Sequence, residues 1–243
     1  DQQALRNSIL AEIGLKNSRI LHLVHEIDVA RVESLETLAI AAEHRDNETG
    51  AHIRRIGGYA RLLAEGMGWL PERVQQIGMA AQLHDIGKLG VPDRVLLKTG
   101  PLTAAEWTTM KRHTETGERI IAVSRGEAMQ TAARIALSHH ERWDGSGYPY
   151  GLSGPAIPVE ARMVAVCDVY DALRSRRPYK AALDHEAALA IMCSGDGRTR
   201  PEQFDPKILR LFVERADRFA EFYERHPDTA ARDASDGTGV AAA

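Results

Sequence analysis

The sequence HDIGK at residues 84–88 puts an imidazole, a carboxylate and an ammonium group close together along the chain. A neutral imidazole beside a carboxylate can bind divalent ions, and the carboxylate can bridge two of them. The motif follows an apolar run with helical spacing that ends at Ala81. We therefore expect it to lie on a helix, with His84 and Lys88 on one face. A His-Asp pair alone is weak evidence, so the interpretation depends on other ligands in the chain.

Further imidazole and carboxylate groups recur near the expected ends of helices. For any one histidine, a surface position or a satisfied core position is the more common explanation. Together the candidates exceed the four ligands of a structural zinc site, and none is a cysteine. Such a set suits iron(II), manganese or zinc in a cluster of two or more ions. The candidate ligands are Glu48, His52, His84, Asp85, His113, His139, His140 and Asp168.

The first 45 residues predict one long helix, because they hold a single glycine and no proline. Apolar residues follow a heptad-like spacing that Arg31 interrupts, with Asn17 at one core-like position. Two interpretations remain open, a helix packed on the domain's own core and a coiled-coil connector to a sensor domain. The heptad-like positions are Leu10, Ile13, Asn17, Ile20, Val24 and Ile27, followed by Leu35, Leu38 and Ala42.

The rest of the chain predicts helices separated by turns. Thr103 followed by Glu106 predicts a capping box, the Gly- and Pro-rich residues 144–158 predict a loop, and Asp205 before Pro206 predicts a helix start. The expected fold is all-α, with a single helical bundle domain preceded by the long N-terminal helix. We expect a connector at 1–45, the domain at 46–227 and a disordered tail at 228–243, where Ala, Asp, Ser, Gly and Thr dominate.

Composition excludes several classes of function. Of the 243 residues, 44% are hydrophobic, and the net charge of −3 provides no long-range field for nucleic acid or an anionic membrane. A phosphate ligand must therefore be held by local charge. Cys167 and Cys193 form no zinc-thiolate motif or disulfide framework, and we expect two buried thiols in a reducing cytoplasm. No apolar run reaches the length of a membrane span. Because the chain begins inside helical sequence without Met, we expect it to be part of a longer protein.

The His84-Asp85 pair resembles the HD phosphohydrolase superfamily. The segment HHERWDGSGYP at 139–149, with Gly147, Tyr148 and Pro149, resembles the signature of its HD-GYP branch. The similarity extends through RDNETGAH, HDIGKLGVPD, KRHTETGE, CDVYDALRSRRPYK and QFDP, and covers roughly residues 35–220. The resemblance implies an HD-type helical fold with metals set in the bundle. It also implies a cytoplasmic bacterial phosphodiesterase that hydrolyses the second messenger cyclic di-GMP to pGpG, GMP or both.

The resemblance also assigns roles to individual residues. Two or three divalent ions are implied, with iron or manganese first and zinc or nickel as other candidates. Glu48 matches the extra carboxylate of members that hold three metals, and Asp46 matches an acidic position near the site. Lys88, Arg177 and Lys180 match residues that contact the substrate, and Asp85 and Lys88 are the expected catalytic pair. The implied metal ligands are His52, His84, Asp85, His113, His139, His140 and Asp168.

Two segments depart from the family pattern. Arg174 and Arg176 make the loop before Pro178 more basic than expected, and SGDGRTRPEQFDP at 194–206 is longer and more charged. Neither departure removes a ligand. They bear on loop shape and regulation rather than on the chemistry.

Other functions and several partners stay open. One alternative is a phosphodiesterase for a hybrid cyclic dinucleotide, or another HD-type nucleotide phosphohydrolase. Another is a non-catalytic module that binds a cyclic dinucleotide or a GGDEF-type partner. The loop at Tyr148 either shapes the substrate groove or docks such a partner. An N-terminal sensor or receiver domain and a second copy of the chain are further candidate partners, whereas nucleic acid and a membrane are not expected.

Overall fold

The computed structural model of this chain describes residues 2–43, 45, 50–175 and 182–228. The described residues contain eleven α-helices and no β-strand, which confirms the expected all-α fold. They also contain no helix long and apolar enough to cross a membrane. The chain divides into two units, residues 1–38 and residues 39–243. The predicted domain boundary at 45/46 falls a few residues later.

The long N-terminal helix is present as α1 (Gln2–Glu43). The heptad-like apolar side chains described from Leu10 to Leu38 are exposed, with Leu10 at 57%, Ile20 at 56% and Ile27 at 65% of their full accessible surface, whereas Ala42 is buried. The stripe from Leu10 to Leu38 is therefore an apolar surface exposed along this helix.

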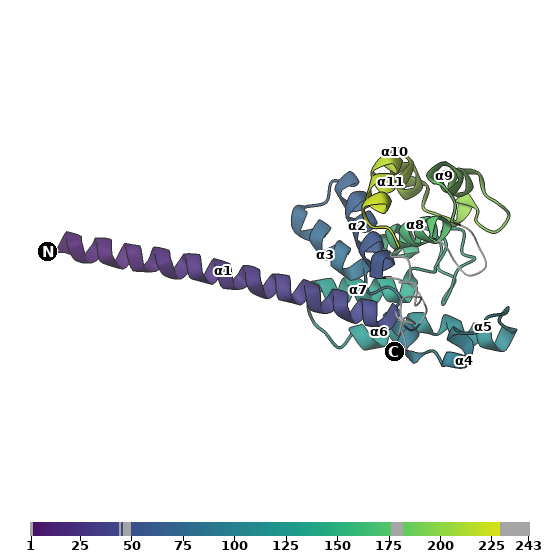
Figure 1. The fold of residues 1–243 in the computed structure, drawn as a ribbon, viewed down its shortest axis with the longest axis horizontal. Coiled ribbons are helices and arrows are strands. Elements are labelled where there is room, and N and C mark those ends of the chain that lie inside the picture. Colours follow the sequence, from purple (N-terminus) through teal and green to yellow (C-terminus); the bar gives the residue numbers. More distant parts are fainter. Residues whose placement is uncertain (1, 44, 46–49, 176–181, 229–243) are drawn as a thin grey trace, which may run out of the picture. The chain divides into compact units, whose positions relative to one another are not determined.

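The helices of residues 39–243 are arranged around α2, α7 and α8 (Figure 1). Helix α2 packs against α3, α8, α10 and α11, and α7 packs against α3, α6 and α8. In chain order the helices are α2 (Gly50–Gly66), α3 (Pro71–Ala81), α4 (Asp93–Leu96), α5 (Ala104–Lys111), α6 (His113–Ile121), α7 (Glu127–Ser138), α8 (Val159–Arg174), α9 (His185–Ser194), α10 (Pro206–Glu214) and α11 (Ala216–Arg225).

An aromatic cluster forms the core between α2, α8, α10 and α11. The rings of Tyr59 and Phe219 stack with their centroids 4.7 Å apart, and Tyr170 meets Phe212 edge-on at 5.2 Å. All four side chains are fully buried. Aromatic pairs of this kind add about 0.5–1.5 kcal/mol each beyond the burial of their area. The cluster therefore fixes α8 against α2, the two helices that carry Asp168 and His52.

Both predicted helix starts are confirmed. Thr103 and Glu106 form the capping box of α5, and Asp205 caps α10 through its side chain. Asp184 caps α9 in the same way. Helix α5 ends at Lys111, and α6 follows from His113. One detail differs from expectation, because the last predicted helix, which starts after Asp205, is split at Arg215 into α10 and α11.

The HDIGK motif does not lie on an α-helix, which corrects the expectation. Helix α3 ends at Ala81, residues 82–85 form a turn, and the 3₁₀ helix η2 (Ile86–Gly90) follows. A Cβ atom on Gly87 would lie 1.8 Å from the carbonyl oxygen of His113, so only glycine permits η2 to pack directly on the start of α6. This close approach brings Asp85 next to His113.

One expectation about the cysteines is also corrected. Cys167 is buried within α8, but Cys193 is exposed, because it lies in the last turn of α9 outside the face that buries Ala188 and Met192.

The expected disordered tail begins at Asp228, which accepts a hydrogen bond from Arg55 over 2.9 Å. The other residues of that tail, 229–243, lie outside the described part of the chain, so their disorder stays a prediction.

Candidate metal centre and substrate cavity

Seven of the eight predicted ligands fall within the described residues, and the structure brings all seven together in two groups. The ligand atoms within each group lie no more than 4.8 Å from one another, a spacing suited to holding a metal ion. One group is Asp85, His113, His139 and His140, and the other is His52, His84 and Asp168.

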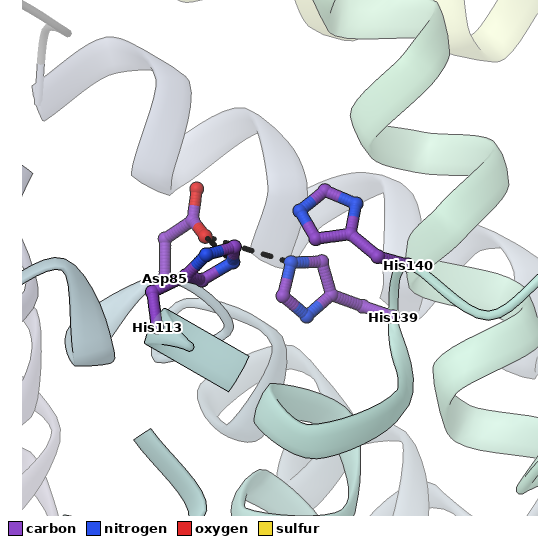
Figure 2. A group of neighbouring side chains, drawn as sticks. All are labelled: Asp85, His113, His139 and His140. Atoms are coloured by element: carbon purple, nitrogen blue, oxygen red, sulfur yellow. Dashed lines mark ion pairs between the residues drawn. The ribbon is translucent and has the colours of Figure 1, made fainter. Parts of the chain in front are cut away.

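Three elements deliver the first group, whose side chains point toward one another in Figure 2. Asp85 precedes η2 and His113 begins α6, while His139 and His140 follow the last turn of α7. The amphipathic sequence of α7 buries Ile135 and Ala136 and so directs the end of this helix into the interior. His139 is therefore buried, and His140 is half-buried.

Asp85 lies between the two groups. Its Oδ1 atom is 3.2 Å from Nε2 of His113 and 3.5 Å from Nε2 of His139, whereas its Oδ2 atom is 3.4 Å from Nε2 of His84. One carboxylate oxygen therefore faces each group. This is the arrangement required of a carboxylate that bridges two ions.

The imidazole tautomers are set by the surrounding backbone. Nδ1 of His84 lies 3.0 Å from the carbonyl oxygen of Ala81, and Nδ1 of His113 lies 2.7 Å from that of Met110. Nδ1 of His139 likewise lies 3.1 Å from the carbonyl oxygen of Ile135. Because a carbonyl oxygen only accepts, Nδ1 carries the proton in each neutral ring and Nε2 keeps its lone pair.

The buried lone pairs fit a metal. Among the described residues, Nε2 of His84, His113 and His139 has no hydrogen-bond partner, although each atom is buried. Leaving such atoms unsatisfied is costly in a protein interior. Coordination of one divalent ion in each ligand group would satisfy all three nitrogens, so the donor set fits the metals expected from the sequence.

Charge in the site also favours cation binding. Burial alone would raise the pKa of the Asp85 carboxyl, but Lys88 and the neighbouring imidazoles outweigh it and hold that pKa well below its usual range. Nζ of Lys88 lies 2.8 Å from Oδ2 of Asp85. Burial and the nearby imidazoles hold the pKa of His140 well below its usual value. Asp85 is therefore ionised and His140 is neutral, as a metal ligand must be.

His52 is positioned by a residue to which the sequence interpretation gave no role. Its Nδ1 atom lies 2.9 Å from Oδ2 of Asp171, which also accepts hydrogen bonds from Arg55. Asp171 is three residues after Asp168 on α8, so the two carboxylates lie on neighbouring parts of one helix face. The three-residue spacing of Asp168 and Asp171 was therefore the feature of the sequence that could have indicated a role for Asp171.

The Gly147-Tyr148-Pro149 loop packs on the ligands. The Tyr148 ring lies 4.7 Å from that of His140 and 6.4 Å from that of His113, measured between centroids. The backbone nitrogen of Tyr148 donates a hydrogen bond to the carbonyl oxygen of His140 over 3.1 Å. The sequence interpretation also gave no role to Glu141. Its buried carboxylate accepts hydrogen bonds from the backbone nitrogens of Tyr150 and Leu152. The loop thus supports His140 from outside.

A cavity of about 570 Å³ opens beside the ligands. Tyr148 lines it together with His139, His140 and Asp168. Four other expected site residues, Glu48, Asp46, Arg177 and Lys180, lie outside the described residues.

A family model described as HD domain matches residues 36–208 of the chain. The chain belongs to the HD domain family. It is 49% identical over 191 residues to the cyclic di-GMP phosphodiesterase response regulator RpfG of Xanthomonas campestris, covering 79% of this chain and 50% of that protein. This similarity confirms the resemblance to the HD-GYP branch.

Other HD domain relatives are named for a different cyclic dinucleotide. The chain is 39% identical to 3′3′-cGAMP-specific phosphodiesterase 2 of Vibrio cholerae, covering 89% of this chain and 40% of that protein. A crystal structure of a cyclic GMP-AMP specific phosphodiesterase of V. cholerae has the same fold, with a TM-score of 0.54 and 18% identity over 82% of this chain and 50% of that one. The chain thus spans 40–50% of the length of these two curated relatives.

Proposed function

We propose that this HD domain hydrolyses the phosphodiester bonds of cyclic di-GMP, giving pGpG, GMP or both, with divalent metal ions as cofactors. The observation that carries the proposal is the position of Asp85, which presents one carboxylate oxygen to each of two ligand groups. The 49% identity to a named cyclic di-GMP phosphodiesterase supports the choice of reaction and substrate.

The ligand set favours two or three ions of iron or manganese, with zinc and nickel as the other candidates. Imidazole and carboxylate donors without thiolate suit these metals. Each of the two groups would hold one ion, and Asp85 would contact both. Glu48 is the proposed additional ligand of a third ion.

Metals bound there would lower the pKa of a water molecule towards neutrality and polarise a phosphoryl oxygen. Asp85 would hold the two groups in register, since it is the one carboxylate described between them. Lys88 would bring a positive charge to the scissile phosphate or to the leaving 3′ oxygen, because its Nζ lies beside Asp85 at the edge of the ligand cluster. Tyr148 would limit how far the substrate can shift from His140.

Recognition of a dianionic substrate needs local cations, because the net charge of the chain is −3. The planar guanidinium of Arg177 can donate two parallel hydrogen bonds to phosphate or guanine, and the ammonium group of Lys180 supplies a single positive charge. Asp46 is the proposed acidic contact. These three assignments rest on the sequence motif.

Hydrolysis of a hybrid cyclic dinucleotide is the second candidate, favoured by the 39% identity to the V. cholerae relative named for 3′3′-cGAMP. A non-catalytic module, which would bind a cyclic dinucleotide or a GGDEF-type partner, is disfavoured. All seven expected ligands within the described residues are present and converge.

The proposed partners follow from α1 and from the length of the relatives. The exposed heptad-like stripe on α1 favours a parallel homodimer, and the longer relatives favour an N-terminal sensor or receiver domain. The reducing cytoplasm is the proposed compartment.

The proposal is tested on anaerobically purified protein by metal analysis together with chromatography of the products. Wild-type protein should contain metal and convert cyclic di-GMP to pGpG or GMP. Asp85→Asn and His84→Ala should abolish turnover while circular dichroism still reports a helical fold. Full activity in a metal-free His84→Ala protein would refute the proposal, and faster turnover of 3′3′-cGAMP would favour the second candidate.

A further inference from the structure

The cavity beside the ligand cluster extends to a loop that the proposed chemistry leaves unused. Its lining includes His139, His140 and Asp168, and also Arg198 and Thr199 of the loop at 195–200. Its volume of about 570 Å³ lies within the range of about 300–1,000 Å³ that is usual for small-molecule sites. A substrate with one phosphate at the ligand cluster would therefore extend toward this loop.

Part of the cavity wall is apolar. On α8, the half-buried side chains of Ala165, Val169 and Ala172 line it at helical spacing, around the position of Asp168. Ala172 is one helical turn beyond Asp168, and the buried side chain of Phe204 lies next to the loop in the sequence. Small and flat apolar surfaces accommodate a planar base better than a phosphate, which needs polar partners.

The loop at 195–200 holds a fixed shape. Oδ1 of Asp196 accepts hydrogen bonds from the backbone nitrogens of Arg198 and Thr199, over 3.0 and 2.7 Å. The backbone nitrogen of Asp196 donates to the carbonyl oxygen of Thr199 over 3.1 Å. Arg200 donates to Oδ2 of Asp144 over 3.2 Å and so ties the loop to the segment that carries Tyr148. Arg198 therefore projects from an ordered turn.

The Arg198 side chain is available for a ligand. It is exposed, it lines the cavity, and its guanidinium makes no hydrogen bond or ion pair with any other residue in the described part of the chain. A guanidinium presents two parallel donors, which match the O6 and N7 acceptors of guanine. Adenine places an amino donor where guanine has O6, so the same side chain disfavours adenine.

We propose that Arg198 binds the O6 and N7 edge of the guanine base that lies away from the scissile phosphate, and thereby selects guanine at that end of the cyclic dinucleotide. This inference rests on the proposed function, since it assigns one part of the same substrate. It gives a role to the segment SGDGRTRPEQ, whose length and charge depart from the family pattern.

The test is a double-mutant cycle between the side chain and N7. Values of kcat and KM are measured for wild-type, Arg198→Ala and Arg198→Lys proteins, with cyclic di-GMP and with its 7-deazaguanine analogue. Arg125→Ala is the matched control, because Arg125 is also exposed and does not line the cavity. Metal content and melting temperature are recorded for each protein.

We expect Arg198→Ala to lower kcat/KM for cyclic di-GMP about 10–100-fold, mainly through KM, with metal content unchanged. Replacing N7 should weaken the wild-type enzyme but cause little further loss in Arg198→Ala. Arg198→Lys should recover part of the loss, because lysine keeps the positive charge but lacks the two parallel donors of the guanidinium. Arg125→Ala should behave like wild type.

Two outcomes overturn the inference while the proposed function stands. In the first, wild type hydrolyses cyclic di-GMP and Arg198→Ala leaves KM unchanged. In the second, Arg198→Ala and the 7-deaza substitution weaken turnover independently, which would place the guanidinium on a phosphate. Absence of turnover of cyclic di-GMP by metal-loaded wild type would instead overturn the proposed function, and this inference with it.

Discussion

Nδ1 of His52 lies 2.9 Å from Oδ2 of Asp171, so a ring on α2 is oriented by a carboxylate on α8. Arg55, one turn after His52 on α2, donates to both oxygens of the same carboxylate over 2.6 and 2.9 Å. Arg55 also donates to the carbonyl oxygen of His226 and to Asp228. One buried network therefore joins an expected metal ligand to the C-terminal end of the domain. Carboxylates that hold a ligating histidine in this way tune metal affinity.

The first prediction concerns this contact. Asp171→Asn should weaken metal binding about 10–100-fold, because the neutral amide holds the His52 ring less firmly. It should also lower the free energy of unfolding by about 3–5 kcal/mol, because the guanidinium of buried Arg55 loses its buried counter-charge and keeps only the partly exposed Asp228. Metal affinity is measured by competition with a chelator on folded protein at low temperature, and stability by denaturant unfolding of the metal-free protein.

Arg55→Met separates the two effects of that substitution. It breaks the same buried ion pair but leaves the contact between His52 and Asp171 in place. It should therefore destabilise the protein with a much smaller change in metal affinity. Equal loss of metal affinity in both variants would show that the network acts only through folding.

The second prediction concerns the signature loop. A Cβ atom on Gly147 would lie 2.3 Å from the backbone nitrogen of Arg142 and 2.5 Å from the carbonyl oxygen of His140. Gly147→Ala must therefore displace the backbone beside His140, and we expect kcat to fall about 10–100-fold. Tyr148→Phe should cost much less, since the ring that packs on His140 is retained.

Gly100→Ala is the control for the loop, because a Cβ atom there would meet nothing within 4 Å. The measurements are kcat for cyclic di-GMP and metal content. Wild-type values for Gly147→Ala would show that the loop adapts without moving His140.

Much of the site could be predicted from the sequence, because ligand type and local spacing carry the information. His139 and His140 follow an apolar helical run, and the Thr103–Glu106 capping box is a local pattern that formed as expected. Both features depend on residues that are close in the sequence. Local patterns of this kind survive in the folded domain.

The remaining features depend on packing between distant segments. His52 and Asp171 are 119 residues apart, so their contact requires α2 to lie against α8. The α-helix expected at HDIGK gives way to a turn and the 3₁₀ helix η2, because Gly87 packs on the carbonyl of His113. Lys88 consequently meets Asp85, three positions away, rather than sharing a helical face with His84. Sequence spacing alone does not predict these contacts between distant segments.

The third prediction concerns pH. Hydrogen bonds from Lys98 and from Thr103 lower the pKa of Glu106 from 4.5 to about 2. A lowered folded-state pKa means that this carboxylate stabilises the fold above pH 4.5, and that the contribution is lost as the pH falls from 4.5 through 2. Glu106→Gln should remove this part of the acid dependence. Melting temperatures of wild type and variant should therefore differ at pH 6 and converge near pH 2.

The fourth prediction concerns α1. A parallel homodimer would bury the exposed side chains of Ile13, Ile20 and Val24, while Leu15 lies off the heptad-like stripe. A double substitution Ile20→Glu and Val24→Glu should convert dimer to monomer in sedimentation equilibrium. Leu15→Glu should not, although Leu15 is more exposed than either. An unchanged oligomeric state in a chain shortened to begin at residue 34 would contradict the prediction.

The fifth prediction concerns the number of metals. Without Glu48, the five histidines, Asp85 and Asp168 provide enough ligands for two ions once Asp85 bridges and water or substrate completes each shell. Glu48 precedes the first residue of α2, Gly50, and adds a carboxylate four positions before His52. Its charge would offset part of the repulsion from a third cation. Wild-type protein reconstituted anaerobically should then hold about three metals per chain, and Glu48→Gln about two.

Glu127→Gln provides the matched control, because Glu127 is an exposed acidic residue in the first turn of α7. Such a residue interacts with the helix dipole, an effect worth about 0.3–1 kcal/mol. If Glu48 acts only through the dipole, both variants should lose a little stability and keep the full metal content. If Glu48 is a ligand, only Glu48→Gln should lose an ion and hydrolyse cyclic di-GMP more slowly, because one cation fewer then faces the phosphate.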